Sequence, residues 1–484
     1  MGAVEEKTDI SGDPSGEKAF VKSTWPILLG SSPQTLTWWG SWYVINILVV
    51  SNLFWPGDPL HGQALGLYYG LGLIVQSFTI LVLGYLSDKY SRLKLMTVNT
   101  VIDGILFMVY GFVPVGMGDA SFLLFLFICV VRAVITAGGG TSQNSPLLMS
   151  YVDDAIKENQ RSRFFGVLIL IQQLSNITGG IIAAIIFKQY WREYFWISGL
   201  ILAITGVIIG LKVKEPKRGA ERNELRNILK LASVNYRYRL SRETAVTLRS
   251  RSNIAIMLEG IFTQIIQAVP FLLLFAYLQS PPYNMSPLSL SFVAILFGLP
   301  GAMIGGVVLA KLSDSYAKKS IKNRVRIIFT SLVMSYVLWL LVFVIPIAPL
   351  TPAEGDNFLI VMSRGAGYWG ISICYLLGQA NGNLFAVNQR PILQKINLPE
   401  AQGLISSANV FLETIGRGMG MILAGSFLDL FSGNYPMTVL VFIALGSVGS
   451  VLWLLTLRWI DRDVTSLSEI LTSRAGAMVN QEKK

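Results

Sequence analysis

Charge is scarce in this sequence of 484 residues, where only 14% of the side chains are Asp, Glu, Lys or Arg and 52% are hydrophobic. The mean hydropathy of +0.55 is far too high for a soluble protein of this length. Apolar runs of about 20 residues, the length that crosses the hydrocarbon core of a bilayer, recur along the chain. The composition therefore excludes a soluble globular fold and predicts an integral membrane protein.

Cysteine and histidine are nearly absent. Cys129 and Cys374 both fall in predicted helices, which excludes a disulfide framework and a metal-thiolate site. The single histidine, His61, falls in a predicted outer loop, so we expect no metal centre in the membrane. No nucleotide-binding Gly-x-x-x-x-Gly-Lys-Ser/Thr motif and no pairing of a nucleophile with a base is present. We therefore expect neither an enzyme nor a bound cofactor.

The chain also lacks two other signals. The first 32 residues contain no basic region leading into a short apolar stretch, so we expect no cleavable signal. No soluble basic module accompanies the net charge of +11, which argues against nucleic-acid binding. Attraction of basic loops to anionic lipid headgroups is the milder alternative.

Twelve apolar runs are present, and they predict an all-α membrane fold. Their spans are 34–55, 62–87, 95–114, 121–152, 163–187, 194–211, 252–279, 287–313, 325–348, 358–389, 402–429 and 437–457. The longest internal hydrophilic stretch divides them six and six. We expect a tail at 1–32, six-helix bundles at 33–211 and 252–459, a basic linker at 212–251 and a second tail at 460–484. The linker is expected to be an amphipathic surface helix in part, or else a solvated tether.

The Lys and Arg residues indicate the orientation. Of the 39, we place 34 in the termini and the loops on the same side, three inside helices and two in predicted outer loops. Cytoplasmic loops of membrane proteins carry the excess of positive charge. We therefore expect a multi-pass protein of the plasma membrane with both termini in the cytoplasm.

A short loop occurs twice. The segment Leu86–Arg92 follows the second predicted helix, and Leu312–Lys318 follows the eighth, at an offset of 226 residues. Four of the seven positions are identical, and both segments end in a basic residue. Internal repeats of this kind are typical of secondary transporters, so the two halves are predicted to be duplicates.

The first copy, Gly84-Tyr-Leu-Ser-Asp88-Lys-Tyr-Ser-Arg92, resembles the signature loop of the major facilitator superfamily, Gly-x-Leu-Ala-Asp-Arg-x-Gly-Arg-Arg. With the second copy and the Arg132 region, the resemblance covers roughly residues 34–459. It implies two six-helix bundles related by a pseudo-two-fold axis, which rock around a central site. Ser91 and Ala310 depart from the pattern, where the family prefers glycine. The subfamily is left open, with spinster-like and drug-efflux-like transporters as candidates.

The resemblance also implies a role for the loop. In the family, its aspartate and arginine belong to a charge network that holds the inner side shut. Asp88 could face the N-terminus of a helix from the other half, such as the eleventh, where the helix dipole favours negative charge. Arg92 could pair with a carboxylate at the inner end of the fourth helix. We expect the latch to comprise Gly84, Asp88, Arg92, Asp153, Asp154 and Asp314.

Ionisable residues inside predicted helices are the next signal, because each costs about 2.5 to 3.5 kcal/mol at mid-bilayer even on the lower scales. We interpret six as a proton-coupling or charge network: Asp103, Arg132, Glu259, Arg364, Glu413 and Arg417. Structural alternatives stay open. Arg132 could be neutralised by Asp103, and Glu413 could pair with Arg417 one turn away.

Uncharged polar groups offer a substrate cavity. The candidates are Asn46, Gln143, Asn144, Gln172, Gln264, Gln267, Trp369 and Gln379. Further amides on the same predicted helices are Gln173, Asn176, Asn381 and Asn383. About half of these amides are expected to link helices instead, since buried amides commonly do so in membranes.

Together these features predict a secondary active transporter that moves a small organic or amphiphilic solute by alternating access, with a proton as the coupling ion. Its expected partners are the solute and membrane lipids, and it is expected to be a monomer. A lipid or drug exporter and a metabolite symporter are both open. The alternative from a different class is a transporter-like receptor or scaffold that binds without moving a solute.

Overall fold

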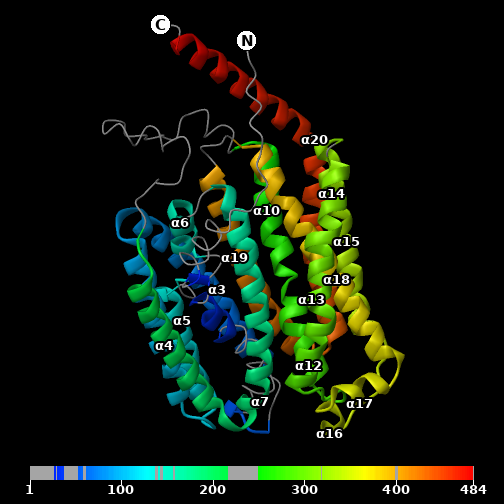
Figure 1. The fold of residues 1–484 in the computed structure, drawn as a ribbon. Helices are drawn as coiled ribbons and strands as arrows, with labels where there is room; N and C mark the ends of the chain where they lie inside the picture. Colours follow the sequence, from blue (N-terminus) through cyan, green and yellow to red (C-terminus); the bar gives the residue numbers. More distant parts are fainter. Residues whose placement is uncertain are drawn as a thin grey trace, which may run out of the picture.

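The computed structural model describes residues 25, 27–28, 30–37, 53–57, 61–136, 140–141, 145–155, 158–215, 249–317, 319–397 and 402–482. Every regular element in these ranges is a helix (Figure 1). Eight helical segments in these ranges are long and apolar enough to span a membrane. They begin at Gly62, Arg92, Asp119, Gln189, Arg251, Pro287, Ile321 and Tyr435. The predicted all-α membrane fold is confirmed.

In the described residues of the N-terminal half, residues 30–37 are helical, and five longer helices follow. They are α3 (Gly62–Lys89), α4 (Arg92–Val109), α5 (Asp119–Thr136), α6 (Pro146–Ala155) and α7 (Glu158–Lys212). A short 3₁₀ turn, η1 (Tyr110–Phe112), extends α4. The long α7 is two helices that meet at Tyr190, whose φ of −129° and ψ of 44° are non-helical. The outer loop predicted between residues 187 and 194 is therefore reduced to a kink.

The C-terminal half contains more interrupted helices. The seventh span is α10 (Arg251–Ile265), the π-helical η2 (Val269–Leu273) and α11 (Leu274–Gln279). The eighth is α12 (Pro287–Val293), π-helical η3 (Ala294–Gly298), α13 (Leu299–Met303), π-helical η4 (Ile304–Leu309) and α14 (Ala310–Ala317). The remainder are α15 (Ile321–Val344), α16 (Pro352–Gly355), α17 (Phe358–Ser363), α18 (Ala366–Lys395), α19 (Gln402–Leu430) and α20 (Tyr435–Glu482).

Two predicted spans are wrong in their extent. The span 121–152 is broken, because α5 ends at Thr136 and Gly140 lies in a turn before α6 begins. Glycine is a poor helix former, and Gly140 fits because a Cβ there would lie 2.8 Å from the carbonyl oxygen of Met96. The span 358–389 is also broken, at Gly365, whose φ of 151° ends α17 before α18 starts.

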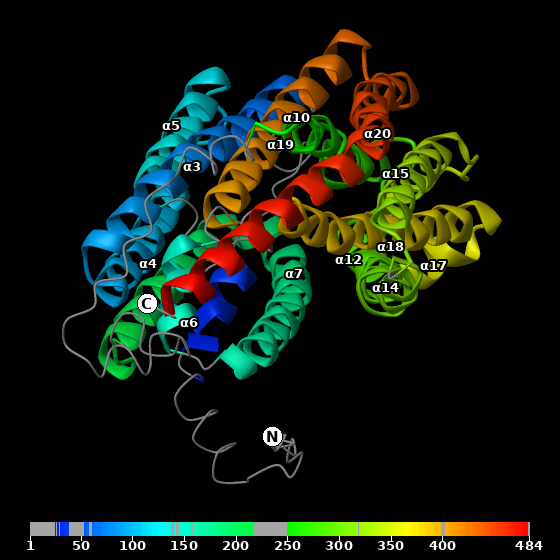
Figure 2. The ribbon, with the colours of Figure 1, turned by 90° about the horizontal axis from the view of Figure 1, so that it is seen from above.

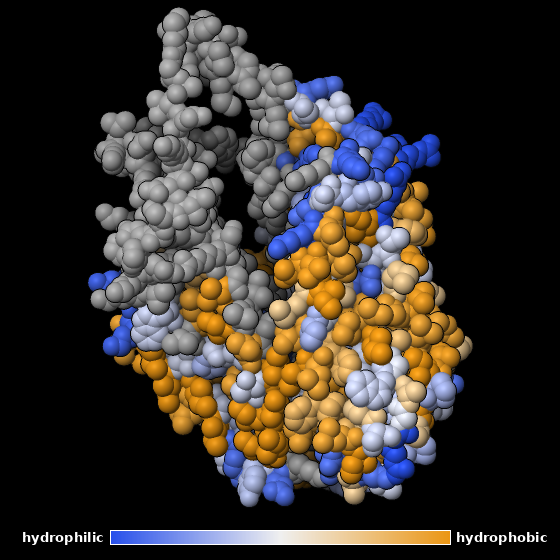
Figure 3. Space-filling view, turned by 45° about the vertical axis from the view of Figure 1, so that its right-hand side comes forward, coloured by the Kyte–Doolittle hydropathy of each residue, from blue (hydrophilic) through white to orange (hydrophobic). Residues whose placement is uncertain are grey.

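The helices run side by side, so their ends gather at two opposite ends of the bundle. We name the end where α3 finishes and α4 begins the basic end, since Lys94, Lys214, Lys311 and Arg324 lie there. The opposite end, where α3 begins and α19 finishes, is the far end. In Figure 3 the surface between these ends is mostly apolar, with hydrophilic side chains at the margins. Such a belt is what a lipid-facing surface requires.

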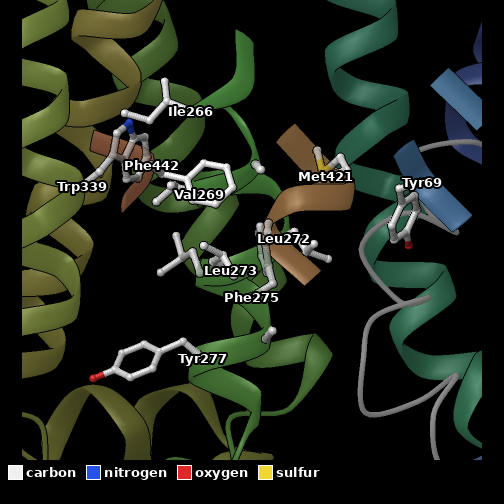
Figure 4. Packing of buried hydrophobic residues seen from close by; sticks show 14 of the residues in the cluster. Tyr69, Ile266, Val269, Leu272, Leu273, Phe275, Tyr277, Trp339, Met421 and Phe442 are labelled. Atoms are coloured by element: carbon white, nitrogen blue, oxygen red, sulfur yellow. The ribbon is translucent and has the colours of Figure 1, made fainter. Parts of the chain in front are cut away.

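The two halves meet along α3 and α19, which pack together, while α4 packs on α7, α15 on α18, and α10 on both α19 and α20. Seen from above, α19 and α10 lie between α3 and α5 on one side and α15 and α18 on the other (Figure 2). One cluster of buried side chains runs through both halves and includes Tyr69, Val269, Leu273, Met421 and Phe442 (Figure 4). Packing of this kind, more than the hydrophobic effect, holds helices together in lipid.

The last helix is longer than expected. The twelfth span was predicted at 437–457 with a tail after it, but α20 continues without a break to Glu482 and projects beyond the bundle (Figure 1). Acidic residues just beyond the predicted span are anchored: the Asp463 carboxylate accepts a hydrogen bond from the Ser252 amide at 3.2 Å. Lys322 pairs with Asp461 at 2.7 Å. The linker helix predicted within 212–251 falls largely on residues 216–248, outside the described part of the chain.

Candidate functional site

A cavity of about 250 Å³ lies between helices of the two halves. Its walls come from α7 of the N-terminal half and from the seventh, eighth and tenth spans of the C-terminal half. The lining residues are Asn176, Ile177, Gly180, Pro270, Phe271, Phe275, Ser291, Ala294, Ile295, Gly298, Leu299, Ala302, Tyr375, Gln379 and Asn383. Ligand sites in helical membrane transporters are commonly formed at such interfaces between repeats.

Two π-helical segments border this cavity. Pro270 and Phe271 belong to η2, and Ala294 and Gly298 belong to η3. Pro270 has no amide hydrogen to donate, so the helical ladder is interrupted where it sits. π-helical turns occur frequently at functional sites. Gly298 is required here, since a Cβ would lie 2.6 Å from the ring of Tyr375.

The cavity wall carries amides and aromatic rings, and no charged residue is among its described lining. Asn383 is tied back by donating to the carbonyl of Gln379 at 2.9 Å, and Ser291 donates to the carbonyl of Pro287 at 2.8 Å. The buried side-chain oxygen of Asn176 has no hydrogen-bond partner among the described residues. Within the described residues, this oxygen is available to accept a hydrogen bond from a solute.

The structure places the predicted cavity residues in several environments. Gln379 lines the cavity, whereas Asn46, Gln143 and Asn144 lie outside the described residues. Gln172 is buried in α7 but is not part of the lining. The lining also omits Gln264 and Gln267, which lie on the seventh span.

The prediction that Trp369 lines the cavity is wrong. Its side chain is 49% exposed, and its indole donates to the carbonyl of Met362 at 3.0 Å. This bond fixes the ring near the α17 turn and away from the cavity. The aromatic wall comes instead from Phe271, Phe275 and Tyr375, which the sequence did not single out. The proline at 270 inside an apolar run was the available signal.

Among the described residues of the N-terminal half, Arg132 and buried Asp103 form a neutral pair. Arg132 on α5 donates to both carboxylate oxygens of Asp103 on α4, at 2.8 and 3.1 Å. The Thr136 hydroxyl adds a third bond to Asp103 at 2.8 Å, and the guanidinium lies 4.9 Å from the centroid of the Phe107 ring. Asp103 is fully buried. Since both charges are satisfied by each other, this pair binds α4 to α5.

Among its described residues, the C-terminal half has a buried acid, Glu259, with no basic group bonded to it. Glu259 on α10 is fully buried and accepts a hydrogen bond from the Thr263 hydroxyl. Among the described residues no Lys, Arg or His forms an ion pair with it. Glu413 on α19 is close enough for the two acidic groups to interact, and it accepts from the Asn409 amide at 2.7 Å.

Among the described residues, Arg417 is the basic group that lies with these acids. It donates through two nitrogens to the side-chain oxygen of Gln264, at 3.1 and 2.9 Å. It also feels the charge of Glu413 one turn away. Gln264, predicted to meet the solute, therefore links α10 to α19. Counting formal charges, Glu259, Glu413 and Arg417 sum to −1.

Arg364 does not belong to this network, and its prediction is wrong. It caps the end of α17 at the far end of the molecule, is exposed, and pairs with Glu354 of α16. The apolar runs on both sides of Gly365 read as one helix in sequence. The break at Gly365 moves the arginine out of the bundle.

The predicted latch loop is described in part. Gly84 lies in α3 and its carbonyl accepts from the Ser87 hydroxyl at 2.6 Å, as the carbonyl of Ala310 does from Ser313 at 2.9 Å. This local repetition matches the duplicated loop. The side chains of Asp88, Asp153 and Asp154 lie outside the described residues, so the pairing predicted for Arg92 stays a prediction.

The start of α4 has a partner that the sequence did not reveal. Glu215, after the end of α7, accepts from the Arg92 amide at 2.9 Å and from the Ser91 hydroxyl. In the second copy, Asp314 is 62% exposed and pairs with Arg324 at 2.6 Å within its own half. Arg324 also donates to Asn388 at 3.1 Å. In this state Asp314 thus stabilises the C-terminal half, rather than bridging the halves as a member of the predicted latch would.

A bundle of apolar helices around a cavity between two sequence halves is an arrangement typical of membrane transport proteins. The sequence model of the Major Facilitator Superfamily matches residues 27–418. The chain therefore belongs to this superfamily, whose members are transporters rather than enzymes, and it is a multi-pass integral membrane protein.

Relatives with curated names are distant. Macrolide efflux protein A of Streptococcus pyogenes is 22% identical over 353 residues, which cover 73% of this chain and 78% of that protein. A protein of Arabidopsis thaliana named for glycerol-3-phosphate transport is 25% identical over 155 residues, and the match spans only 28% of its length and 32% of this chain. Tetracycline resistance protein class H of Pasteurella multocida is 26% identical over 137 residues, 27% of this chain and 31% of that protein.

Solved structures share the fold. A bacterial homologue of the human lysosomal transporter Spinster, inward-facing and occupied, superposes with a TM-score of 0.66 at 14% identity, covering 92% of this chain and 98% of that one. The nucleoside transporter NupG gives a TM-score of 0.62 at 14% identity over 90% and 98%. At such identities the likeness defines the fold alone.

Proposed function

We propose that this secondary transporter moves an uncharged or amphiphilic organic solute through the cavity between α7 and the seventh, eighth and tenth spans, by alternating access. The observation that carries the proposal is the lining itself, which combines amides and aromatic rings with no charged residue among the described lining. Walls from both halves would separate and rejoin as the halves rock, which exposes the solute to each side in turn.

The lining also favours one group of substrates over another. A phosphorylated solute calls for arginine or lysine side chains that form charge-assisted hydrogen bonds. The described lining contains neither. Aromatic rings such as Phe271 and Phe275, with a few amides for orientation, suit a largely apolar ligand. Transport of a drug-like or lipid-like compound is therefore better supported than transport of a phosphorylated metabolite.

A proton is the proposed coupling ion. Among the described residues, buried Glu259 and half-buried Glu413 and Arg417 form a cluster of two acidic groups and one basic group. An isolated buried charge in a membrane is expensive, so such residues usually face a pathway or exchange a proton. Binding and release of one proton here, in step with the rocking of the halves, would link the solute to the proton gradient.

Binding is tested by a thermal-shift screen of the purified protein against drugs, lysolipids and metabolites, since a ligand of the folded state raises its unfolding temperature. Hits are then measured in proteoliposomes for flux. A ligand that binds but is never moved would favour a receptor. Failure of every amphiphile, with hits only among charged metabolites, would contradict the proposed substrate class.

A matched pair of variants places the solute. Asn383 lines the cavity and Asn381 does not, yet each donates to a carbonyl of the preceding turn at 2.9 Å. We expect Asn383→Ala to weaken the apparent affinity for a confirmed ligand by about 1 kcal/mol, or about five-fold. Asn381→Ala should leave it unchanged, as isothermal titration would measure. Equal effects would move the site elsewhere.

We further propose that the basic end faces the cytoplasm of a cell whose plasma membrane holds the protein, with both termini on that side and one chain as the transport unit. The basic residues at that end support the orientation. Protease cleavage of the end of α20 in inside-out but not right-side-out vesicles is the expected result.

A further inference from the structure

The two halves are joined by hydrogen bonds at the far end of the molecule. Asp429, near the end of α19, accepts from the amide of Gly62 at 2.9 Å through one carboxylate oxygen and from the amide of Gln63 at 2.7 Å through the other. These two amides open α3. Gly62 and Asp429 are 367 positions apart in the sequence, so the contact joins one half to the other.

The start of α3 has no cap from its own segment. His61 occupies the capping position and makes no side-chain capping hydrogen bond. The first amides of a helix have no partner within the helix, and the helix dipole places partial positive charge there. A carboxylate that bonds two of these amides is therefore favourable both as an acceptor and as a charge. Asp429 supplies it from the other half.

The backbones of α3 and α19 also touch below this cap. Gly62, Gly66 and Gly70 recur at a spacing of four residues and form one face of α3. A Cβ at Gly66 would lie 2.5 Å from the carbonyl oxygen of Met421, and one at Gly70 would lie 2.4 Å from that of Gly418. Small residues at this spacing allow two helices to approach until their backbones meet. The far-end part of this interface is therefore closed.

The two helices carry aspartate at matching positions. Asp429 is the penultimate residue of α19, and Asp88 is the penultimate residue of α3. Because the helices run antiparallel, the start of one lies beside the end of the other. The predicted latch at Asp88 is at the basic end, and the observed cap at Asp429 is at the far end.

We propose that Asp429 is the far-end latch of this transporter: it holds the far side shut in the state seen here, and its bonds to Gly62 and Gln63 break when the cavity opens to that side. The inference rests on the proposed alternating access. It adds a contact at the far end to that proposal, since the duplicated loop lies only at the basic end. A second contact across the halves, α12 against α7, also lies at the far end and is consistent with closure there.

A carboxylate that only stabilises local structure would have its bonding partner in the same half of the molecule. Asp119, also at a far-end helix start, accepts from the Trp55 indole at 3.1 Å within the same half. Loss of that bond leaves the relation between the halves untouched. Asp119→Asn is therefore the matched control for Asp429→Asn, because both changes replace a far-end carboxylate by an amide.

The test measures distances between spin labels in full-length protein in lipid nanodiscs, with both native cysteines replaced by alanine. The far-end pair is Met117→Cys with Met437→Cys, at side chains that are 61% and 46% exposed. The basic-end pair is Leu211→Cys with Leu312→Cys, at 79% and 64% exposure. Each pair joins the two halves, so together they report which end is open.

We expect Asp429→Asn to raise the ratio of far-end-open to far-end-closed molecules about 3- to 10-fold, seen as a longer far-end distance and a shorter basic-end distance. Gly62→Ala should act in the same direction, because its Cβ would lie 2.8 Å from the Asp429 oxygen and 3.0 Å from the carbonyl oxygen of Gly425. Gly382→Ala, with nothing within 4 Å of the added Cβ, is the control for that change.

Wild-type distances in both Asp429→Asn and Gly62→Ala would overturn the latch, and so would an equal shift in Asp119→Asn. The distances are measured without any solute. A protein that transports nothing but still opens on loss of Asp429 would therefore sink the proposed function and leave the latch standing.

Discussion

The two halves of this transporter bury their charges in opposite ways. In the N-terminal half, Arg132 and Asp103 are joined by two hydrogen bonds and sum to zero. In the C-terminal half, the described residues place one basic group, Arg417, near Glu259 and Glu413, and Arg417 donates through two nitrogens to Gln264. Among the described residues, the surplus of acidic over basic groups in such a cluster occurs in the C-terminal half. Under the proposed function, the N-terminal pair is structural and the C-terminal cluster exchanges the proton.

The largest expected effect is at the neutral pair. Asp103→Asn leaves Arg132 buried without its counter-charge, which should destabilise the protein by about 3 to 5 kcal/mol. Thermal unfolding in detergent would measure the loss. The double variant Asp103→Asn with Arg132→Gln should recover much of it, since no lone charge remains. A single variant as stable as the wild type would show that the pair is not a structural link.

Replacing Glu259 should affect transport more than stability. Glu259→Gln keeps an oxygen that can accept from Thr263, so the unfolding temperature should change little. Transport, by contrast, should lose its dependence on pH between about 5.5 and 8, the range over which a coupled carrier responds to the gradient. Initial rates in proteoliposomes give the answer.

The matched control for this change is Glu354→Gln, which alters a carboxylate paired with exposed Arg364 at the far end. Its pH profile should equal that of the wild type. If wild-type transport is itself independent of pH over this range, the proton is not the coupling ion.

The smallest effects separate the two arginines. Arg132→Lys loses a fork that reaches both oxygens of a carboxylate, whereas Arg417→Lys loses a fork on one neutral amide oxygen. Charge-assisted two-point bonds are the stronger kind, so we expect about 1 to 2 kcal/mol of destabilisation for the first and about half of that for the second. The reverse order in thermal unfolding would place the tighter charge network in the C-terminal half.

The sequence predicted the helical membrane fold because the apolar runs that specify it are local and long. It also offered pairing with Asp103 as the structural alternative to a coupling role for Arg132, since intramembrane charges have few neutralising choices. It failed at Arg364, where the apolar runs flanking Gly365 concealed a break. Mean hydropathy over a window hardly changes with a single glycine, whereas the backbone conformation at Gly365 decides where the helix ends.

Contacts between distant segments were out of reach. Glu215 bonds to the Arg92 amide from 123 residues away, and Asp429 bonds to Gly62 from 367. Neither is an intramembrane charge, and so neither stood out. In the cavity, Gln379 was named but Tyr375 was not, because its place over Gly298 depends on the π-helical turn of η3. Such a turn rotates side chains relative to a regular helix, and the hydrophobic periodicity of the sequence does not indicate it.

The central claim is that the C-terminal acids couple solute movement to protons across a cavity between the halves. Its most direct test is to load proteoliposomes with a pH dye, add a confirmed ligand, and record proton and solute flux together. We predict that solute movement drives a proton flux in the wild type, and that Glu259→Gln still binds the solute but moves no protons with it. Solute flux without a proton signal in the wild type, or an unchanged proton signal in Glu259→Gln, would contradict the account.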